Sequence, residues 1–304
     1  MKVSVLMNCY NSAKYLREAI DSVYAQTYTD WEIIFWDNNS SDESAEIAKS
    51  YDDKVKYYKG DVTVPLYSAR NLALEKVTGD VIGFLDCDDI WLPEKLEKQM
   101  PLFKNPKVGL VYSDTFFFNE TGITKRFFSD RPHFTGECFE ALLDSYFLSL
   151  ETVLVRTEAM KSLDYYFDDR FNMVGDADLF RRIGYSWELD MVDEPLAQWR
   201  VHENSLSWKV PEKFAEETKL MLEKYHEIFP GFEGKYPNGL KHLKRDIAIG
   251  LTKAKFQRGD MKAGREIVKD HLWSTKAKLL YGCSFLPSFV YTTAYKMYLN
   301  KIGV

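Results

Sequence analysis

Residues 79–91, GDVIGFLDCDDIW, decide the fold. The uncharged run from Val81 to Leu85 ends in three carboxylates, those of Asp86, Asp88 and Asp89. A short apolar run that ends in such a cluster is typical of a buried strand in a parallel sheet. In open α/β sheets the ligand crevice lies beyond the carboxyl ends of the strands. The segment therefore predicts both a central strand and the edge of the sheet that carries a site.

The carboxylates at the end of this run have two interpretations. Asp86 and Asp88 are two residues apart, so in an extended chain they project to the same side. Two convergent carboxylates suit a hard cation, Mg²⁺ or Mn²⁺, that carries a diphosphate and keeps some waters. The alternative is a solvated acidic turn before a helix, because Pro93 would stand in the first turn of a helix that begins near Trp91. Spacing alone does not decide between the two.

Strand and helix signals alternate through the first hundred residues. Strands are expected at 3–7, 31–36, 55–58, 81–85 and 108–113, and helices at 13–26, 44–51, 68–76 and 94–103. This alternation predicts an α/β fold with a twisted, mostly parallel, Rossmann-like sheet and right-handed crossovers. The sequence has neither G-x-G-x-x-G after its first strand nor a P-loop motif, which argues against dinucleotide-binding and P-loop proteins.

The pattern changes after residue 202. Before it, shorter strands are expected at 115–119 and 152–155, and helices at 139–146 and 176–183. Beyond it, helical spacing dominates at 212–226, 240–258 and 261–271. We therefore expect an α/β domain over residues 1–205 and a helical C-terminal region over residues 206–304.

Composition narrows the class of protein. The chain has 304 residues and a net charge of −6, so no basic field points to nucleic acid. Its four cysteines lack C-x-x-C spacing, which excludes an obvious zinc site and predicts free thiols in a reducing compartment. The chain enters its first strand pattern at once, without the apolar region of a signal peptide, so we expect a cytoplasmic protein.

The last segment, residues 271–304, has four lysines and no acidic residue. Its uncharged, aromatic-rich part, residues 279–295, contains Gly282 and Pro287, which argue against a membrane-spanning helix. Two interpretations stay open. The segment is either an interfacial anchor on the inner face of the cell membrane or a helical element packed on the domain.

Six motifs occur in order along residues 1–205. They are VSVLMNCYN at 3–11, IIFWDNNSSD at 33–42, SARN at 68–71, LDCDD at 85–89, GDADL at 175–179 and QWRVH at 198–202. With these motifs the chain resembles the family 2 glycosyltransferases, inverting enzymes of the GT-A fold that use nucleoside-diphosphate sugars. The resemblance covers about two thirds of the chain.

The resemblance implies a donor site around the acidic motif. Asp88 corresponds to the usual metal ligand, Asp86 lies near the ribose, and His202 reaches the metal or the diphosphate. Arg200 belongs to the same closing segment and is assigned to the donor. Arg70 suits a phosphate or a pairing with the acidic motif, and a structural ion pair is its alternative.

The resemblance also implies where the nucleotide binds. Asp37 corresponds to the residue that accepts a hydrogen bond from the base, and Tyr10 would stack on the base. A carboxylate accepts from a ring N–H of uracil or of a purine, so it does not choose between them. Asn8 stands where a proline is common, and Asn38 where a second aspartate is common. We expect Mn²⁺ or Mg²⁺ as the metal and UDP as the nucleotide of the donor.

An inverting transfer needs one general base to deprotonate the acceptor hydroxyl. Asp176 is the candidate, because it aligns with the second residue of the family's Glu-Asp pair, whereas Gly175 replaces the Glu. Its alternative role is to cap the helix that follows. Asp178 is the alternative base, although residues two apart in a helix do not share a face.

The resemblance thus implies a metal-dependent inverting glycosyltransferase that acts on a hydroxyl of a saccharide or lipid-linked saccharide in surface polysaccharide or glycan synthesis. A nucleotidyltransferase would be expected to show a Gly-rich basic loop after the first strand, and residues 8–14 lack one. A non-catalytic module that binds sugar nucleotides or glycans is a further alternative, favoured if Gly175 marks a lost acceptor site. A membrane-tethered scaffold built on residues 212–304 is the last.

Overall fold

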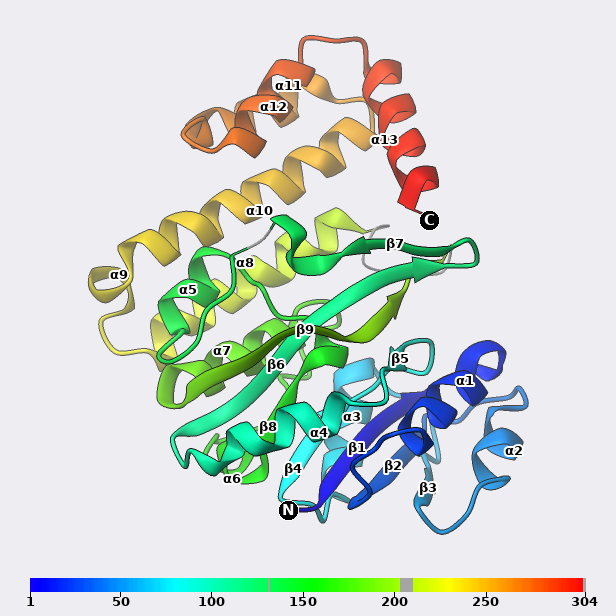
Figure 1. Ribbon diagram of the computed structural model, residues 1–304. Helices are drawn as coiled ribbons and strands as arrows, with labels where there is room; N and C mark the ends of the chain where they lie inside the picture. Colours follow the sequence, from blue (N-terminus) through cyan, green and yellow to red (C-terminus); the bar gives the residue numbers. More distant parts are fainter. Residues whose placement is uncertain (131, 203–209, 303–304) are drawn as a thin grey trace. The chain divides into compact units, whose positions relative to one another are not determined.

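The computed structural model describes residues 1–130, 132–202 and 210–302 (Figure 1). The chain forms two compact units, one of residues 1–139 and 147–200 and one of residues 140–146 and 201–304. The predicted boundary at residue 205 falls within 203–209, which lie outside the described residues. The predicted domain limits therefore stay a prediction.

A mixed sheet forms the first unit. Among the described residues it has nine strands in the order β3-β2-β1-β4-β8-β6-β9-β5, and β7 pairs with β6. The strands β3, β2, β1 and β4 are parallel, β8 is antiparallel to β4 and β6, and β6 runs parallel to β9. The predicted α/β class is confirmed. The strands are β1 (Val3–Cys9), β2 (Trp31–Asp37), β3 (Val55–Lys59), β4 (Val81–Phe84), β5 (Ile90–Trp91), β6 (Val108–Asn119), β7 (Gly122–Arg126), β8 (Leu154–Arg156) and β9 (Glu188–Arg200).

Helices connect the strands of this unit and bury their apolar sides. In α1, Leu16, Ile20 and Val23 recur at helical spacing and join the core formed with Val5 and Phe35 of the sheet. The helices are α1 (Ala13–Tyr24), α2 (Ser44–Lys49), α3 (Leu66–Leu74), α4 (Lys95–Gln99), α6 (Thr157–Lys161) and α7 (Gly175–Ser186). Short 3₁₀ turns are η1 (Met100–Lys104), η2 (Phe127–Asp130) and η3 (Leu150–Thr152).

The structure differs from the sequence-based expectations in the second half of the sheet. The two strands expected at 108–113 and 115–119 are one strand, β6. The thirteen-residue strand β9 was not predicted, because it contains Pro195 and four acidic residues and lacks a clear alternation. The helix expected at 94–103 is present as α4 followed by a 3₁₀ turn, and just before it Ile90 and Trp91 pair with β9 as the short strand β5, which was not expected.

The segment 79–91 folds back on itself. A Cβ atom at Gly83 in β4 would lie 2.6 Å from the ring of Trp91, so this strand position has room only for glycine. The indole Nε1 of Trp91 donates to the backbone oxygen of Glu151 at 2.8 Å. The strand, its acidic turn and the tryptophan therefore form one packed element.

The second unit is helical. Its core contains Ile249, Phe256, Val268, Ala277 and Leu280. No helix among the described residues combines the length and apolar content needed to cross a bilayer. The four cysteines of the chain are free thiols, as predicted. The helices are α5 (Phe139–Asp144, of which the first residue belongs to the sheet unit), α8 (Pro211–Ile228), α9 (Phe232–Lys235), α10 (Pro237–Gln257), α11 (Met261–Val268), α12 (Thr275–Cys283) and α13 (Ser288–Ile302), with a 3₁₀ turn, η5 (Lys269–His271).

Candidate active site

The carboxyl ends of three parallel strands meet at one edge of the sheet. Cys9 at the end of β1 pairs in register with Asp37 at the end of β2, and Leu6 of β1 pairs with Phe84 at the end of β4. The turns that carry Tyr10, Asp37 and Asp86 therefore follow neighbouring strands. The structure thus places the predicted nucleotide-binding residues and the acidic motif at the same edge, where ligands of α/β sheets bind.

The turns after β1 and β2 are tied together by hydrogen bonds. Asn11 adopts the left-handed conformation with φ of 51°. Its side-chain oxygen accepts from the backbone N–H of Ser41 at 2.8 Å. Asp42 accepts from the backbone N–H of Ala13 at the start of α1, at 2.9 Å. This frame presents Tyr10 with 54% of its surface exposed, as a base-stacking side chain requires.

Asp37 is fully buried and both of its carboxylate oxygens accept hydrogen bonds. Oδ1 accepts from the backbone N–H of Ser40 at 2.7 Å, and Oδ2 accepts from the hydroxyl of Tyr57 at 2.6 Å. Burial, followed by the bond to Asp37, raises the pKa of the Tyr57 hydroxyl, which stays protonated as the donor. Asp37 is thus a structural acceptor in this structure, and its contact with a base stays a prediction.

Asn8 is a candidate site residue whose role the sequence did not predict. Both amide atoms of its side chain are buried and lack a hydrogen-bond partner within the described part of the chain. The indole Nε1 of Trp36, which pairs with Asn8 in register, is in the same condition. Buried polar groups are nearly always hydrogen-bonded in native proteins. These orphaned atoms at the ligand edge therefore fit a polar ligand.

The acidic motif is joined to α3 by an ion pair. Arg70 is buried, and its guanidinium donates to Oδ1 of Asp86 at 2.6 Å, whereas the Asp86 side chain is 41% exposed. Burial alone would lower the pKa of Arg70, but the charges of Asp86 and Asp176 outweigh it and keep the side chain protonated. The alternative predicted for Arg70, an ion pair with the motif, is thus present.

Asp176 lies at the start of α7, and its negative charge contributes to the raised pKa of Arg70. Its Oδ1 accepts from the hydroxyl of Tyr67 at 3.2 Å. Burial raises the pKa of Asp176, although the positive Arg70 and the bond from Tyr67 oppose this effect. A Cβ atom at Gly175 would lie 2.5 Å from the Tyr67 ring. The aromatic ring therefore fills the space that the side chain of a Glu at position 175 would need.

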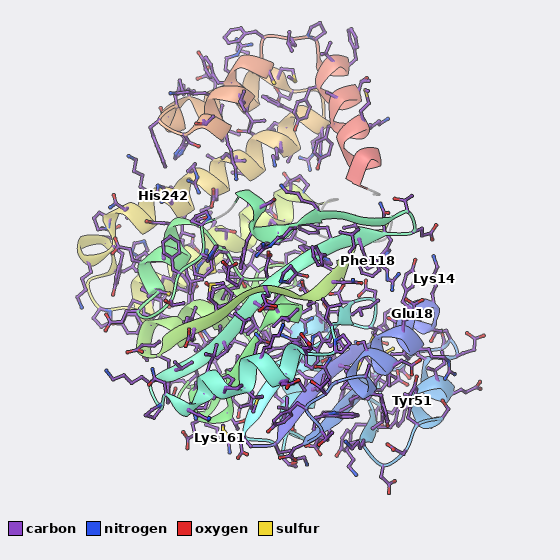
Figure 2. The ribbon with its side chains drawn as sticks, viewed as in Figure 1. Lys14, Glu18, Tyr51, Phe118, Lys161 and His242 are labelled. Atoms are coloured by element: carbon purple, nitrogen blue, oxygen red, sulfur yellow. The ribbon has the colours of Figure 1, made fainter. Side chains whose placement is uncertain are left out.

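Arg200 holds the turn that contains Asp88 and Asp89. Its backbone N–H donates to Oδ1 of Asp89 and its Nε donates to the backbone oxygen of Asp88, both at 2.8 Å. Its guanidinium also forms an ion pair with Glu18 of α1 at 2.6 Å and lies over the rings of Tyr15 at 4.2 Å and Phe118 at 4.4 Å; Glu18 and Phe118 are labelled in Figure 2. Arg200 is buried by these contacts. These partners of Arg200 are all protein groups, and direct contact with a donor stays a prediction.

The residues at the motif fit a divalent cation only in part. Asp86 and Asp88 are half-buried carboxylates beyond the end of β4, and carboxylate oxygens are ligands that Mg²⁺ and Mn²⁺ accept. In residues 1–130, 132–202 and 210–302 no group of three or more His, Cys, Asp or Glu could hold a metal ion. Mg²⁺ usually binds through one or two carboxylates together with substrate phosphates. The donor set thus suits a cation that arrives with a diphosphate.

The residues that form this edge of the sheet match a known protein family. The model described as glycosyl transferase family 2 matches residues 4–160, which is more than half of the chain. The chain belongs to glycosyltransferase family 2. An uncharacterized glycosyltransferase of Methanocaldococcus jannaschii is 31% identical to this glycosyltransferase over 206 residues, which are 66% of the chain and 70% of the relative.

Another relative carries a substrate in its name. The UDP-Glc:α-D-GlcNAc-diphosphoundecaprenol β-1,3-glucosyltransferase of Escherichia coli is 32% identical over 126 residues, 41% of this chain and 50% of the relative. The alignment thus spans half the length of that enzyme.

Solved structures show the same fold at low identity. TarS of S. aureus in complex with UDP-GlcNAc gives a TM-score of 0.60 at 19% identity, over 88% of this chain and 81% of TarS. A mannosyltransferase of Pyrobaculum calidifontis in complex with GDP-Man and Mn²⁺ gives 0.65 at 16% identity, over 99% and 85%. These matches confirm the predicted GT-A fold with its helical C-terminal part.

Two further predicted residues of the glycosyltransferase are described by their own surroundings. Asp178 is fully buried, and its Oδ2 accepts from Nε of Arg182 at 2.9 Å within α7. His202 is half-buried and follows β9 by two residues, in the second compact unit. Its role toward Asp88 stays a prediction.

Proposed function

We propose that this glycosyltransferase is a metal-dependent, inverting enzyme that transfers a sugar from a nucleoside-diphosphate sugar to a hydroxyl of a saccharide or lipid-linked saccharide. The observation that carries the proposal is the chain of charges from Asp86 through the buried Arg70 to Asp176. It joins the motif assigned to the donor with a carboxylate whose pKa is raised. The name of the E. coli relative, which includes a diphosphoundecaprenol-linked sugar as acceptor, supports a lipid-linked saccharide as the acceptor class.

The nucleotide would lie over the ends of β1 and β2. Tyr10 would stack on the base, Asp37 would accept from its ring N–H, and the orphaned amide of Asn8 would supply one donor and one acceptor. We propose UDP as the nucleotide, supported by UDP-Glc in the name of the E. coli relative and by UDP-GlcNAc in TarS. The GDP-Man of the mannosyltransferase makes GDP the first competitor to test.

Asp88 and His202 would hold Mn²⁺ or Mg²⁺, and Asp86 would face the ribose. When bound, the cation neutralises the negative charge that develops on the leaving diphosphate. Arg200 keeps the backbone of Asp88 in place, and Arg70 orients Asp86. The Mn²⁺ bound in the mannosyltransferase of the same fold supports this assignment.

Asp176 would act as the general base. Its carboxylate would take the proton of the acceptor hydroxyl while that oxygen forms a bond to the anomeric carbon. The bond from this carbon to the diphosphate oxygen breaks, and the nucleoside diphosphate leaves with the electron pair from the opposite face, which inverts the configuration. A raised pKa makes Asp176 a better proton acceptor, whereas the carboxylate of Asp178 is held by Arg182.

The test compares Asp176→Asn with Asp178→Asn. UDP-glucose, UDP-GlcNAc and GDP-mannose are incubated with each variant and Mn²⁺, and the released nucleoside diphosphate is measured, with water as the acceptor. Asp176→Asn should lower the rate about a hundred- to ten-thousandfold, the range of general base catalysis. The shift in melting temperature caused by the nucleotide should remain, because donor binding does not use Asp176.

The outcome assigns the base and the stereochemistry separately. Near-normal turnover in Asp176→Asn together with loss in Asp178→Asn would move the base to Asp178. The anomeric form of the released sugar, followed by NMR before mutarotation, tests inversion. Release of the same anomer as in the donor would contradict an inverting mechanism whichever carboxylate is the base.

A further inference from the structure

The last two helices of the second unit carry a cluster of exposed apolar side chains. Leu279 of α12 is 66% exposed, and Phe289 and Met297 of α13 are 67% and 68% exposed. Phe285 and Leu286 extend the cluster through the turn that joins the two helices. We call these five residues the α12–α13 patch. Single exposed apolar residues are ordinary, but five within nineteen residues are typical of a surface that binds a partner.

The patch does not result from poor packing of the helices. Ala277 and Leu280 of α12 are buried in the core of the unit. Tyr291 of α13 packs edge-on against Phe256 of α10, with ring centroids 5.0 Å apart. Each helix therefore has one face bound to its own unit and an opposite face that carries the apolar side chains. In Figure 1 α12 is drawn in orange and α13 in red, joined by their short turn.

The segment that carries the patch is basic. Residues 271–304 contain four lysines and no acidic residue, in a chain whose net charge is −6. Lys276 and Lys278 of α12 and Lys296 of α13 are exposed. An apolar surface with a basic border is complementary to the interface of an anionic membrane.

We propose that the α12–α13 patch binds the surface of an anionic lipid membrane. The apolar side chains enter the headgroup region, and the lysines contact lipid phosphates. The helix α13 has fifteen residues, too few to span a bilayer, so it lies along the surface. Self-association through this patch is disfavoured, because residues 271–304 contain four lysines and no acidic residue, so two copies would bring these lysines together. The inference is independent of the reaction assigned to the sheet unit.

The experiment is a flotation assay with the full chain and phosphatidylcholine vesicles, with and without phosphatidylglycerol. The protein should float with the anionic vesicles and detach as salt is raised, because salt screens the attraction of lysines. The double variant Leu279→Gln/Phe289→Gln should lower the binding constant about tenfold or more. Lys276→Gln/Lys278→Gln should lower it about fivefold for each lysine.

Matched controls come from the sheet unit. Ile123→Gln replaces an apolar residue that is 58% exposed on β7, and Lys161→Gln replaces the exposed lysine of α6 labelled in Figure 2. Both controls should bind vesicles as the wild type does, and every variant should keep the melting temperature. Wild-type protein that stays unbound with both kinds of vesicle would overturn the proposal. A dimer that the double variant abolishes, without vesicle binding, would overturn it in favour of self-association.

Discussion

The aspartate at the end of β2 and those after β4 occupy equivalent places in the sheet but have opposite surroundings. Asp37 is fully buried, and the N–H of Ser40 and the hydroxyl of Tyr57 hold both of its oxygens. Asp86 and Asp88 are half-buried and reach solvent. The strand end fixes where a carboxylate stands, and its neighbours decide its use. A carboxylate that is fixed by two hydrogen bonds suits the recognition of a base. A carboxylate that reaches solvent suits a site at which the charge on the leaving diphosphate develops during the reaction.

The largest expected effect is the loss of activity in Asp88→Ala. We expect release of nucleoside diphosphate to fall about a hundred- to a thousandfold, because charge on the leaving group loses its stabilisation. The melting temperature should change little, since the side chain is only half-buried. The exposed Glu75, changed to Ala, serves as the control and should leave the rate unchanged. A large fall in melting temperature for Asp88→Ala would show that Asp88 is a structural carboxylate, as Asp37 is.

Asp37→Ala should differ from Asp88→Ala in that its main effect is a loss of stability. It leaves the backbone N–H of Ser40 and the hydroxyl of Tyr57 without an acceptor, so unfolding by urea should reveal a loss of about 2–4 kcal/mol. Nucleotide binding, measured by the shift in melting temperature, should weaken as well. Full stability in this variant would mean that Asp37 is not a structural acceptor and does not differ in this respect from Asp88.

A smaller effect is expected from Tyr67→Phe, which keeps the ring over Gly175 and removes the bond to Asp176. This bond favours the ionised form of Asp176, so its loss raises the pKa of a base that burial has already raised. The rate falls as pH drops through that pKa, and the acidic limb of the pH–rate profile should move to higher pH. At the low end kcat should be about fivefold lower, with KM for the donor unchanged. An unmoved limb would show that the hydroxyl does not act on the base.

The smallest effect is expected from Tyr57→Phe. It removes one of the two bonds to Asp37, and the other, from Ser40, remains. The free energy of unfolding should fall by about 1 kcal/mol, and nucleotide affinity should decrease less than in Asp37→Ala. An effect equal to that of Asp37→Ala would show that the tyrosine alone holds the carboxylate.

The fold could be predicted where each element repeats a simple period. The strands β1, β2 and β4 are short apolar runs and the helix α1 has apolar residues at helical spacing, and the structure contains all of them. The strand β9 could not be predicted, because its pairing with β6 runs through irregular register near Asp114 and its sequence includes a proline. Long-range pairing stabilises this strand more than its own residues do.

The candidate site could be predicted in its motifs but not in its supporting contacts. Asp37, Asp86 and Asp176 stand at strand or helix ends that the motifs marked. The tyrosine over Gly175 could not be predicted, because residues 67 and 175 meet only in the folded chain. The glycine at position 175, where the family has a Glu, was the one sequence signal of this contact. The ring of Tyr67 fills the space that the Glu side chain would need. The orphaned amide of Asn8 appears only when burial is known.

The hydrogen bonds by which Arg200 fixes the acidic turn cannot form until late in translation. Its bonds to Asp89, Asp88 and Glu18 join residues 111, 112 and 182 positions apart in sequence. The parallel strands β1 to β4 lie within the first 84 residues, so they can pair while the rest of the chain is still being made. The turn that bears Asp88 leaves the ribosome more than a hundred residues before the arginine that fixes it. A nascent chain can therefore pass through a stage in which its four parallel strands are paired while the contacts that fix its active site are still missing.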